Sequence, residues 1–286
     1  MNKFLFPNNE MSSKKIAIEI EAGRADRNYW SDIWAFRELL MFLAWRDILV
    51  RYKQTAIGIA WSLIRPLVTM VVCTIIFGRL AGMPSNGVPY PLLVFAALLP
   101  WQLFASSLSD SSNSLLSNAN MISKIYFPRL IVPASSIVVS LVDFLITFVL
   151  LIGLMIWYQV MPTWRLMLIP VLVVLALAIA LGAGLWFAAL NTKFRDFRYI
   201  VPFIVQIGLY SSPVGFSSDV VPEKWRMLYS LNPMVAVIDG FRWAIIGGEG
   251  RLYWPGFLVS CLFIGLLLLT GIRYFRKTEK TFADVI

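Results

Sequence analysis

Four charged residues stand just ahead of the first long apolar run of the chain: Arg46, Asp47, Arg51 and Lys53. The apolar periodicity predicts a helix over 33–53. Asp47 and Arg51 are four residues apart with the acid first, a spacing that favours an ion pair on the helix surface. The surplus of cations is typical of a helix anchored at a membrane surface. It is equally typical of a helix that meets a partner or a substrate head group.

The remaining acidic residues are too isolated for two-carboxylate catalysis. Beyond the N-terminal segment, Asp110, Asp143 and Asp239 are far apart, and no acidic pair is adjacent or separated by one residue. The chain has no histidine, which excludes Ser-His triads, imidazole metal sites and histidine acid–base chemistry. We therefore expect no catalytic and no metal-binding residues. Asp143 lies inside an apolar run, where an ionisable group favours a functional role, although a paired or protonated carboxyl is the simpler interpretation.

The chain carries no phosphate-binding loop of the Gly-x-x-x-x-Gly-Lys-Ser/Thr type. It cannot cradle ATP in the usual way, and we expect no cofactor bound by this chain. If its work is driven by ATP, the energy must enter from a separate subunit. Cys73 and Cys261 each lie inside an apolar run, which predicts two buried thiols rather than a disulfide.

The composition is that of a membrane protein. Of the 286 residues, 59% are hydrophobic and 14% are charged, whereas soluble domains have about 45–50% and about 25%. A bilayer core needs roughly 20 apolar residues as helix, and the runs do not alternate as barrel strands would. The sequence predicts an all-α integral membrane protein with six transmembrane helices, at 57–78, 91–108, 130–158, 166–190, 199–216 and 252–272.

Lysine and arginine are distributed unevenly over the predicted loops. With six spans, eighteen of them lie on the side of the two termini and six on the other. Since cytoplasmic loops collect these residues, we expect both termini in the cytoplasm. This bias also explains the net charge of +9 without a nucleic-acid partner.

Two segments outside the spans are predicted to be helical. Residues 31–56 form an interface helix, with Ser31 or Asp32 as its cap. The region 217–251 is too short and too charged to cross the membrane, and a re-entrant hairpin fits it better. Its helix is predicted to start at Asn232 and Pro233 and to stop at Gly247 and Gly248, with an ion pair between Asp239 and Arg242.

The remaining boundaries follow from composition. Residues 1–30 form a cytoplasmic N-terminal segment without the features of a signal peptide. Residues 109–120 and 191–198 have loop character, and 276–286 form a cytoplasmic tail. Gly182 and Gly184 predict a close approach of two helices. No internal repeat divides the six-span unit, 57–275.

Four stretches in order carry a family resemblance. The first comprises Arg46, Asp47, Arg51, Tyr52, Gly58, Trp61, Pro66 and Leu67, and the others are 118–133, 191–202 and 212–248. Together they resemble the membrane subunits of ABC transporters that export polysaccharides, such as O-antigen, capsule and teichoic acid. Such proteins often have Ser-x-Leu-Gly before the first span, and Thr55-Ala56-Ile57-Gly58 departs mildly from it.

The resemblance implies an inner-membrane permease that acts as a homodimer with two ATPase subunits, which bind ATP and magnesium. It exports a lipid-linked polysaccharide, O-antigen in the first instance. The interface helix would hinge at Gly58 and offer cations to a diphosphate. The substrate gate would comprise Arg46, Arg51, Tyr52, Lys53, Gly58 and Trp61. Within a coupling loop at 111–128, Met121, Ile122, Lys124 and Tyr126 would meet the ATPase.

Aromatic rings pack well on the C–H faces of sugars, although most aromatic residues here suit interfacial belts. The pore candidates are Trp61, Phe77, Trp101, Phe104 and Tyr210. Asn232, Pro233, Asp239 and Arg242 mark the external re-entrant region. Arg65 is predicted to extend to the membrane surface from the end of its span.

Three other functions remain open on the sequence alone. The chain could export capsule or teichoic acid rather than O-antigen. It could be a membrane enzyme acting on a lipid-linked sugar, but the acid–base cluster is missing. It could also be an ion-coupled transporter, against which stand the absent repeats and the single buried acid.

Overall fold

The protein is described by a computed structural model that covers residues 29–53, 58–85, 87–194, 196–247, 252–279 and 282. Within these ranges the regular structure is helical throughout and contains no strand. The predicted N-terminal segment before Tyr29, the residues 54–57, Arg195 and Gly248 fall outside them. The elements are α1 (Tyr29–Ala35), α2 (Arg37–Lys53), α3 (Gly58–Cys73), η2 (Thr74–Leu80), α4 (Tyr90–Ser117), α5 (Ala119–Ile122), α6 (Ile131–Trp157), η3 (Trp164–Leu168), α7 (Ile169–Lys193), α8 (Phe197–Ser211), η4 (Ser218–Val220), α9 (Glu223–Tyr229), α10 (Pro233–Ile246) and α11 (Trp254–Glu279).

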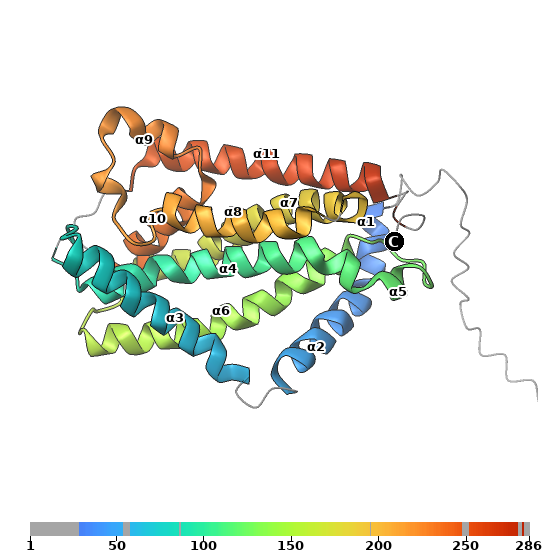
Figure 1. Cartoon of the computed structure of the whole chain (residues 1–286), viewed down its shortest axis with the longest axis horizontal. Coiled ribbons are helices and arrows are strands. Elements are labelled where there is room, and N and C mark those ends of the chain that lie inside the picture. Colours follow the sequence, from blue (N-terminus) through green and yellow to red (C-terminus); the bar gives the residue numbers. More distant parts are fainter. Residues whose placement is uncertain are drawn as a thin grey trace, which may run out of the picture.

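The long helices run side by side, with α4 at the centre of the bundle (Figure 1). Helix α4 packs against both α6 and α7, and α7 packs in turn against α11. The helices α9 and α10 lie at one end of the bundle, whereas α1 and α5 lie at the other (Figure 1). Because α4 is enclosed by its neighbours, most of its apolar side chains are buried.

In the part of the chain that the structure describes, five helical segments are long and apolar enough to cross a membrane. They are Ala60–Leu80, Tyr90–Ser117, Ile131–Trp157, Trp164–Lys193 and Trp254–Glu279. The expected fifth span at 199–216 is represented by α8, which has 15 residues. At 1.5 Å per residue, α8 is about 22 Å long, shorter than a hydrocarbon core of about 30 Å. The count of six spans therefore stays a prediction.

Helix α8 ends early because of a proline. Ser212 is extended, with φ −98° and ψ 155°, and Pro213 follows it. A residue before proline is disfavoured in the helical region, and proline lacks the N–H that would continue the helix. The apolar run continues past this point as turns.

Two local predictions were wrong. Residues 109–117, predicted as loop, are the last turns of α4. The hydroxyls of Ser112, Ser114 and Ser117 bond to carbonyls one turn earlier in the same helix, as Ser112 does to Ser109 at 2.9 Å, so they do not interrupt it. In addition, the helix at the N-terminal side begins at Tyr29, which places Ser31 and Asp32 inside α1 rather than at a cap.

The glycines of α7 allow close helix contacts, as expected. A Cβ atom on Gly182 would lie 2.9 Å from the backbone of Leu268, and one on Gly271 of α11 would lie 2.3 Å from the carbonyl oxygen of Gly182. On Gly184 it would lie 2.5 Å from Oγ of Ser111 in α4. These contacts bring α7 against both α11 and α4.

We predict that Gly271→Ala destabilises the protein, because the added methyl group collides with backbone atoms that cannot rotate away. Overpacking of this kind costs about 1–3 kcal/mol. The matched control is Gly265→Ala in the same helix, where a Cβ atom meets nothing within 4 Å. Thermal unfolding of the purified proteins in detergent should separate the two variants. Equal melting temperatures would contradict the close packing of α7 and α11.

Candidate functional site

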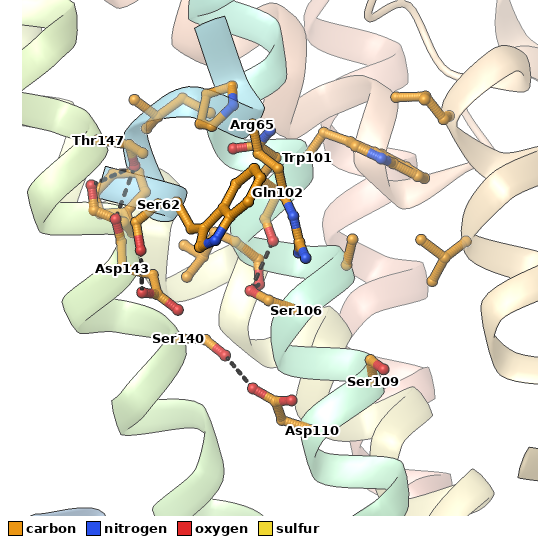
Figure 2. A pocket seen from close by; sticks show the side chains of 18 of the residues that line it. Ser62, Arg65, Trp101, Gln102, Ser106, Ser109, Asp110, Ser140, Asp143 and Thr147 are labelled. Carbon is orange, nitrogen blue, oxygen red and sulfur yellow. Dashed lines mark hydrogen bonds between the residues drawn. The ribbon is translucent and has the colours of Figure 1, made fainter. Parts of the chain in front are cut away.

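A polar cavity of about 750 Å³ opens in the side of the bundle between α2, α3, α4, α6 and α8. Polar and apolar side chains both line it, and Figure 2 shows polar ones from the level of Arg65 and Thr147 to that of Asp110. The polar lining comprises Arg51, Ser62, Arg65, Gln102, Ser106, Ser109, Asp110, Ser140, Asp143, Thr147 and Gln206. A cavity of this size with convergent polar groups is the default candidate for a binding site.

One arginine joins three helices at this cavity. Arg51 of α2 donates one Nη to Oδ2 of Asp143 in α6 at 2.5 Å and the other to Oδ2 of Asp110 in α4 at 2.7 Å. Burial by itself lowers the pKa of Arg51, but the two carboxylates outweigh it and the pKa is raised. The guanidinium is therefore firmly cationic, and its charge is offset by two acids.

Both carboxylates have further partners. The hydroxyl of Tyr52 donates to Oδ1 of Asp143, and Oγ of Ser62 in α3 reaches the same atom at 3.1 Å. Burial raises the pKa of Tyr52 to about 12, so its hydroxyl keeps the proton that it donates. Ser140 donates to Asp110 at 3.4 Å (Figure 2). Four helices thus meet at one hydrogen-bonded cluster.

This geometry corrects one expectation and resolves another. Arg51 does not pair with Asp47, as the four-residue spacing predicted, because Asp110 and Asp143 compete for it. Asp47 instead pairs with its neighbour Arg46 at 2.7 Å. For Asp143 the simpler interpretation holds, since it is a paired carboxylate. Arg46 also donates to Oδ1 of Asn118 at 2.8 Å, beyond the end of α4.

The other predicted gate residues are scattered. Trp61 lines the cavity and is 54% exposed, whereas Lys53 is exposed on α2. Gly58 is the first residue of α3, and the hinge predicted there involves 54–57, which lie outside the described residues. The structure thus groups Arg51, Tyr52 and Trp61 with the cavity. The gate role of the whole set stays a prediction.

Arg65 is a cavity residue whose position the sequence did not reveal. It comes from α3 and points into the cavity (Figure 2). Its guanidinium forms no ion pair or side-chain hydrogen bond with the described residues, in contrast to that of Arg51. The apolar run around Arg65 suggested only a long side chain reaching the surface. The sequence signal that could have indicated this position is the four-residue spacing between Trp61 and Arg65, which places both side chains on one face of a helix.

The predicted pore aromatics do not form one surface in this chain. Trp101 lines the cavity and packs on Phe104 with ring centroids 5.3 Å apart. Phe104 itself is buried in the core. Phe77 does not line the cavity and lies against Gly215. Tyr210 is 66% exposed on α8. Their role as a pore lining stays a prediction.

The segment around α5 is held by a second cluster at one end of the bundle. The side chain of Glu279, at the end of α11, accepts from the backbone N–H of Arg129 at 2.7 Å and from the hydroxyl of Tyr29 at 2.9 Å. The Arg129 guanidinium donates to the carbonyl of Glu279. Arg276 lies 4.5 Å over the Tyr29 ring. We call this group, Tyr29, Arg129, Arg276 and Glu279, the Glu279 cluster.

The predicted coupling residues lie beside this cluster and differ in exposure. Ile122 is buried in a small core with Leu43 and Phe275. Lys124 and Tyr126 are exposed, and Met121 is half-buried. Residues 123–126 thus form a short exposed segment between the buried Ile122 and Arg129, which Glu279 holds. The sequence did not predict the Glu279 cluster, because its members are far apart in the chain.

Helix α10, in the region predicted to be external, starts where the sequence predicted. Oδ1 of Asn232 accepts from the N–H of Met234 at 3.1 Å, and Pro233 is the first residue of α10. Gly247 ends the helix at φ 69°. The predicted Asp239–Arg242 ion pair was wrong, because Arg242 donates to the carbonyls of Leu93, Val214 and Phe216 at 2.7–3.2 Å, and Asp239 accepts from Ser218 at 2.8 Å.

Comparisons with known proteins agree with this architecture. The sequence profile described as ABC-2 type transporter matches residues 38–246. A protein named O-antigen export system permease protein RfbA, from Klebsiella pneumoniae, is 30% identical over 87% of this chain and 95% of its own length. A protein of the same name from Myxococcus xanthus is 29% identical over 89% and 98%. The polysialic acid transport protein KpsM of Escherichia coli is 24% identical over 78% and 89%.

We predict that Arg51→Leu lowers the stability of the protein, because it leaves Asp110 and Asp143 facing each other without a cation. We expect a loss of about 1–3 kcal/mol, less than for a fully buried pair because the Arg51 side chain is 35% exposed. The double variant Arg51→Leu/Asp143→Asn should recover part of this loss. Thermal unfolding measures both, with the exposed Arg37→Leu of the same helix as control. Additive effects of the two substitutions would contradict the pairing.

A second prediction concerns the Glu279 cluster. Glu279→Gln keeps the size of the side chain and removes a charged acceptor, so the segment that carries Arg129 should open more often. A loss of about 1–2 kcal/mol corresponds to roughly tenfold faster trypsin cleavage after Lys124. Lys277→Gln is the control on the same helix turn. Unchanged cleavage in Glu279→Gln would mean that the cluster does not anchor this segment.

Proposed function

The chain belongs to the ABC-2 type transporter family, and from this membership we propose that it is the membrane subunit of an exporter of lipid-linked polysaccharide, with O-antigen as the cargo. The observation that carries the proposal is the similarity to O-antigen export permeases along almost the whole chain. The lower identity to the polysialic acid transport protein makes capsule export the second candidate. The work of the chain is transport rather than catalysis.

We propose that the chain is a multi-pass protein of the inner membrane with both termini in the cytoplasm. In this arrangement α8 and the turns that follow it serve as the fifth of six spans, and α9 and α10 form the re-entrant hairpin. The distribution of lysine and arginine supports the orientation. The end of the bundle that carries α1 and α5 then faces the cytoplasm.

Helix α2 is proposed to lie at the cytoplasmic membrane surface. One side of it packs on α6, with Leu43 and Ala44 buried. The opposite side exposes large apolar residues, among them Met41, Phe42 and Trp45, each more than 60% exposed. An apolar face that leaves the bundle, with charges along its edges, suits a helix embedded in the head-group region.

A second copy of the chain would close the cavity. The cavity is flanked by α3 and α8, and most side chains of α8 and several large ones of α3 are exposed in the single chain. Two such chains, related by a two-fold axis, would bury these faces and turn two open cavities into one passage. This supports a homodimer in which each chain supplies half of the path.

Of the described residues that line it, the cavity offers one cation, Arg65, to a diphosphate-linked glycan. Arg65 is directed into it without a partner among the described residues, and arginine binds phosphate oxygens in a bidentate manner. Arg51 is held by two carboxylates, so it becomes available to an anion only when α2 moves away from α4 and α6. We propose that Arg65 contacts the entering diphosphate and that Arg51 is released as the passage opens.

The energy for that movement would come from an ATPase subunit bound at α5. Lys124 and Tyr126 offer exposed side chains to this subunit. The Glu279 cluster holds the residues that follow them, at Arg129, against the end of α11. Movement of the docked ATPase after ATP binding would therefore be passed to the helices around the cavity. The sequence lacks a phosphate-binding loop, which is consistent with this division of work.

We predict that Arg65→Gln lowers O-antigen export about tenfold or more, the effect of losing one charge-assisted phosphate contact. The assay is surface O-antigen in cells whose own copy of the gene is deleted and replaced by the variant. Arg79→Gln, an exposed arginine in η2 outside the cavity, is the control. The deletion strain tests the proposed function, which is rejected if surface O-antigen persists without the gene. It is also rejected if the purified chain never associates with an ATPase.

A further inference from the structure

A second cavity, of about 800 Å³, lies between α9, α10 and the start of α11. It is at the end of the bundle opposite to α5 (Figure 1). Its lining includes Tyr229 of α9, Asp239 and Trp243 of α10, and Tyr253 and Phe257 near the start of α11. It shares no lining residue with the cavity around Arg65. The two are therefore separate sites in the chain.

Two polar groups at this cavity lack full hydrogen bonding. The hydroxyl of Tyr229 is buried and has no partner among the described residues. Asp239 accepts one hydrogen bond from Ser218 at 2.8 Å, and its other oxygen accepts none from the described side chains. Buried polar groups in folded proteins are nearly always paired. An unpaired hydroxyl beside a half-satisfied carboxylate is therefore suited to a ligand that offers hydroxyl groups.

The cations at this cavity are already engaged. Arg242 donates to three backbone carbonyls. Arg226 donates to the carbonyl of Val221 and lies 3.8 Å from the carboxylate of Asp219. Among the described lining residues, the polar groups still open thus include an acceptor and a hydroxyl but no cation. An anionic ligand would meet two carboxylates here, whereas a neutral ligand with hydroxyl donors would be accommodated.

Aromatic rings form part of the apolar wall, together with aliphatic side chains, and Trp243 is held from outside the cavity. The guanidinium of Arg165 lies 4.7 Å over the Trp243 ring, and Trp164 meets the same ring edge-to-face at 6.4 Å. Neither partner lines the cavity. Tyr253 is 40% exposed beside it. Fixed rings next to an acceptor and a hydroxyl fit the two surfaces of a sugar, its C–H face and its hydroxyl edge.

We propose that this second cavity binds neutral sugar units of the exported polysaccharide, at the end of the path away from the ATPase. The assignment rests on the proposed function for its source of ligand, and on Tyr229, Asp239, Trp243 and Tyr253 for its chemistry. It separates two kinds of recognition in one chain. The cavity around Arg65 takes the charged end of the substrate, and this cavity takes its uncharged repeat.

The test uses the full chain in nanodiscs and a cysteine placed at the cavity. Ser85 lines it, and Ser85→Cys is introduced after Cys73 and Cys261 are replaced by alanine. The rate of alkylation by a maleimide is measured with and without two probes. One probe is the neutral polysaccharide released by mild acid from lipopolysaccharide of the host cell, and the other is inorganic pyrophosphate. We expect the polysaccharide to slow alkylation and pyrophosphate to have no effect.

Tyr229→Phe provides the decisive variant, because it removes only the unpaired hydroxyl and should not disturb folding. We expect the polysaccharide concentration that gives half-protection to rise about three- to tenfold, the loss of one hydrogen bond. Tyr199→Phe, at an exposed tyrosine of α8 that lines neither cavity, should leave it unchanged. Equal protection in Tyr229→Phe, no protection in the parent protein, or protection by pyrophosphate would each overturn the proposal.

The proposed function is judged separately, by export and ATPase association in the deletion strain and in Arg65→Gln. Export that depends on Arg65, together with unprotected Ser85→Cys, would retain the exporter and reject the sugar site. Protected Ser85→Cys in a chain that supports no export would retain the sugar site and reject O-antigen as the cargo of an ATP-driven exporter.

Discussion

The position of α2 depends on one guanidinium. Arg51 contacts the carboxylates of Asp143 in α6 and Asp110 in α4. Ser62 of α3 donates to the carboxylate of Asp143 as well. An arginine between two acids in a partly buried setting holds its partners by charge and by geometry. The arrangement of α2, α3, α4 and α6 around the cavity follows from that contact. Because each acid alone would be poorly accommodated beside apolar helices, the cluster forms as a unit.

The rest of the bundle provides a fixed frame for this cluster. Helix α4 is enclosed on most sides, and α7 approaches α11 closely at Gly182 and Gly271. Helices α3, α8 and the outer side of α2 leave apolar side chains uncovered, and so does one side of α11. The cavity is therefore lined by the enclosed α4 together with the more exposed α3 and α8. This arrangement suits a site in which α4 stays in place while the neighbours of α3 and α8 change.

The sequence predicted the helices better than their contacts. Apolar runs placed α6, α7 and α11 correctly, and Asn232-Pro233 marked the start of α10. Local spacing failed where a distant residue competed, as for Arg51, which left Asp47 for Asp110 and Asp143, and for Arg242, which left Asp239 for carbonyls. The serine-rich segment 109–117 was wrongly predicted as a loop from its composition. It is helical, and the hydroxyls of Ser112, Ser114 and Ser117 bond to carbonyls within the helix. The Glu279 cluster joins residues about 250 positions apart, and no local pattern encodes such a contact.

Helix α11 begins beside the second cavity and ends at the Glu279 cluster. With 26 residues it is about 39 Å long, and α7 supports it along one side. A rigid rod of this length carries a displacement at one end to the other with little loss. A push that reaches Glu279 through Arg129 would therefore shift Tyr253 and Phe257 as well. In the proposed exporter, sugar binding at the second cavity would in this way be coupled to the same movement that admits substrate at the first cavity.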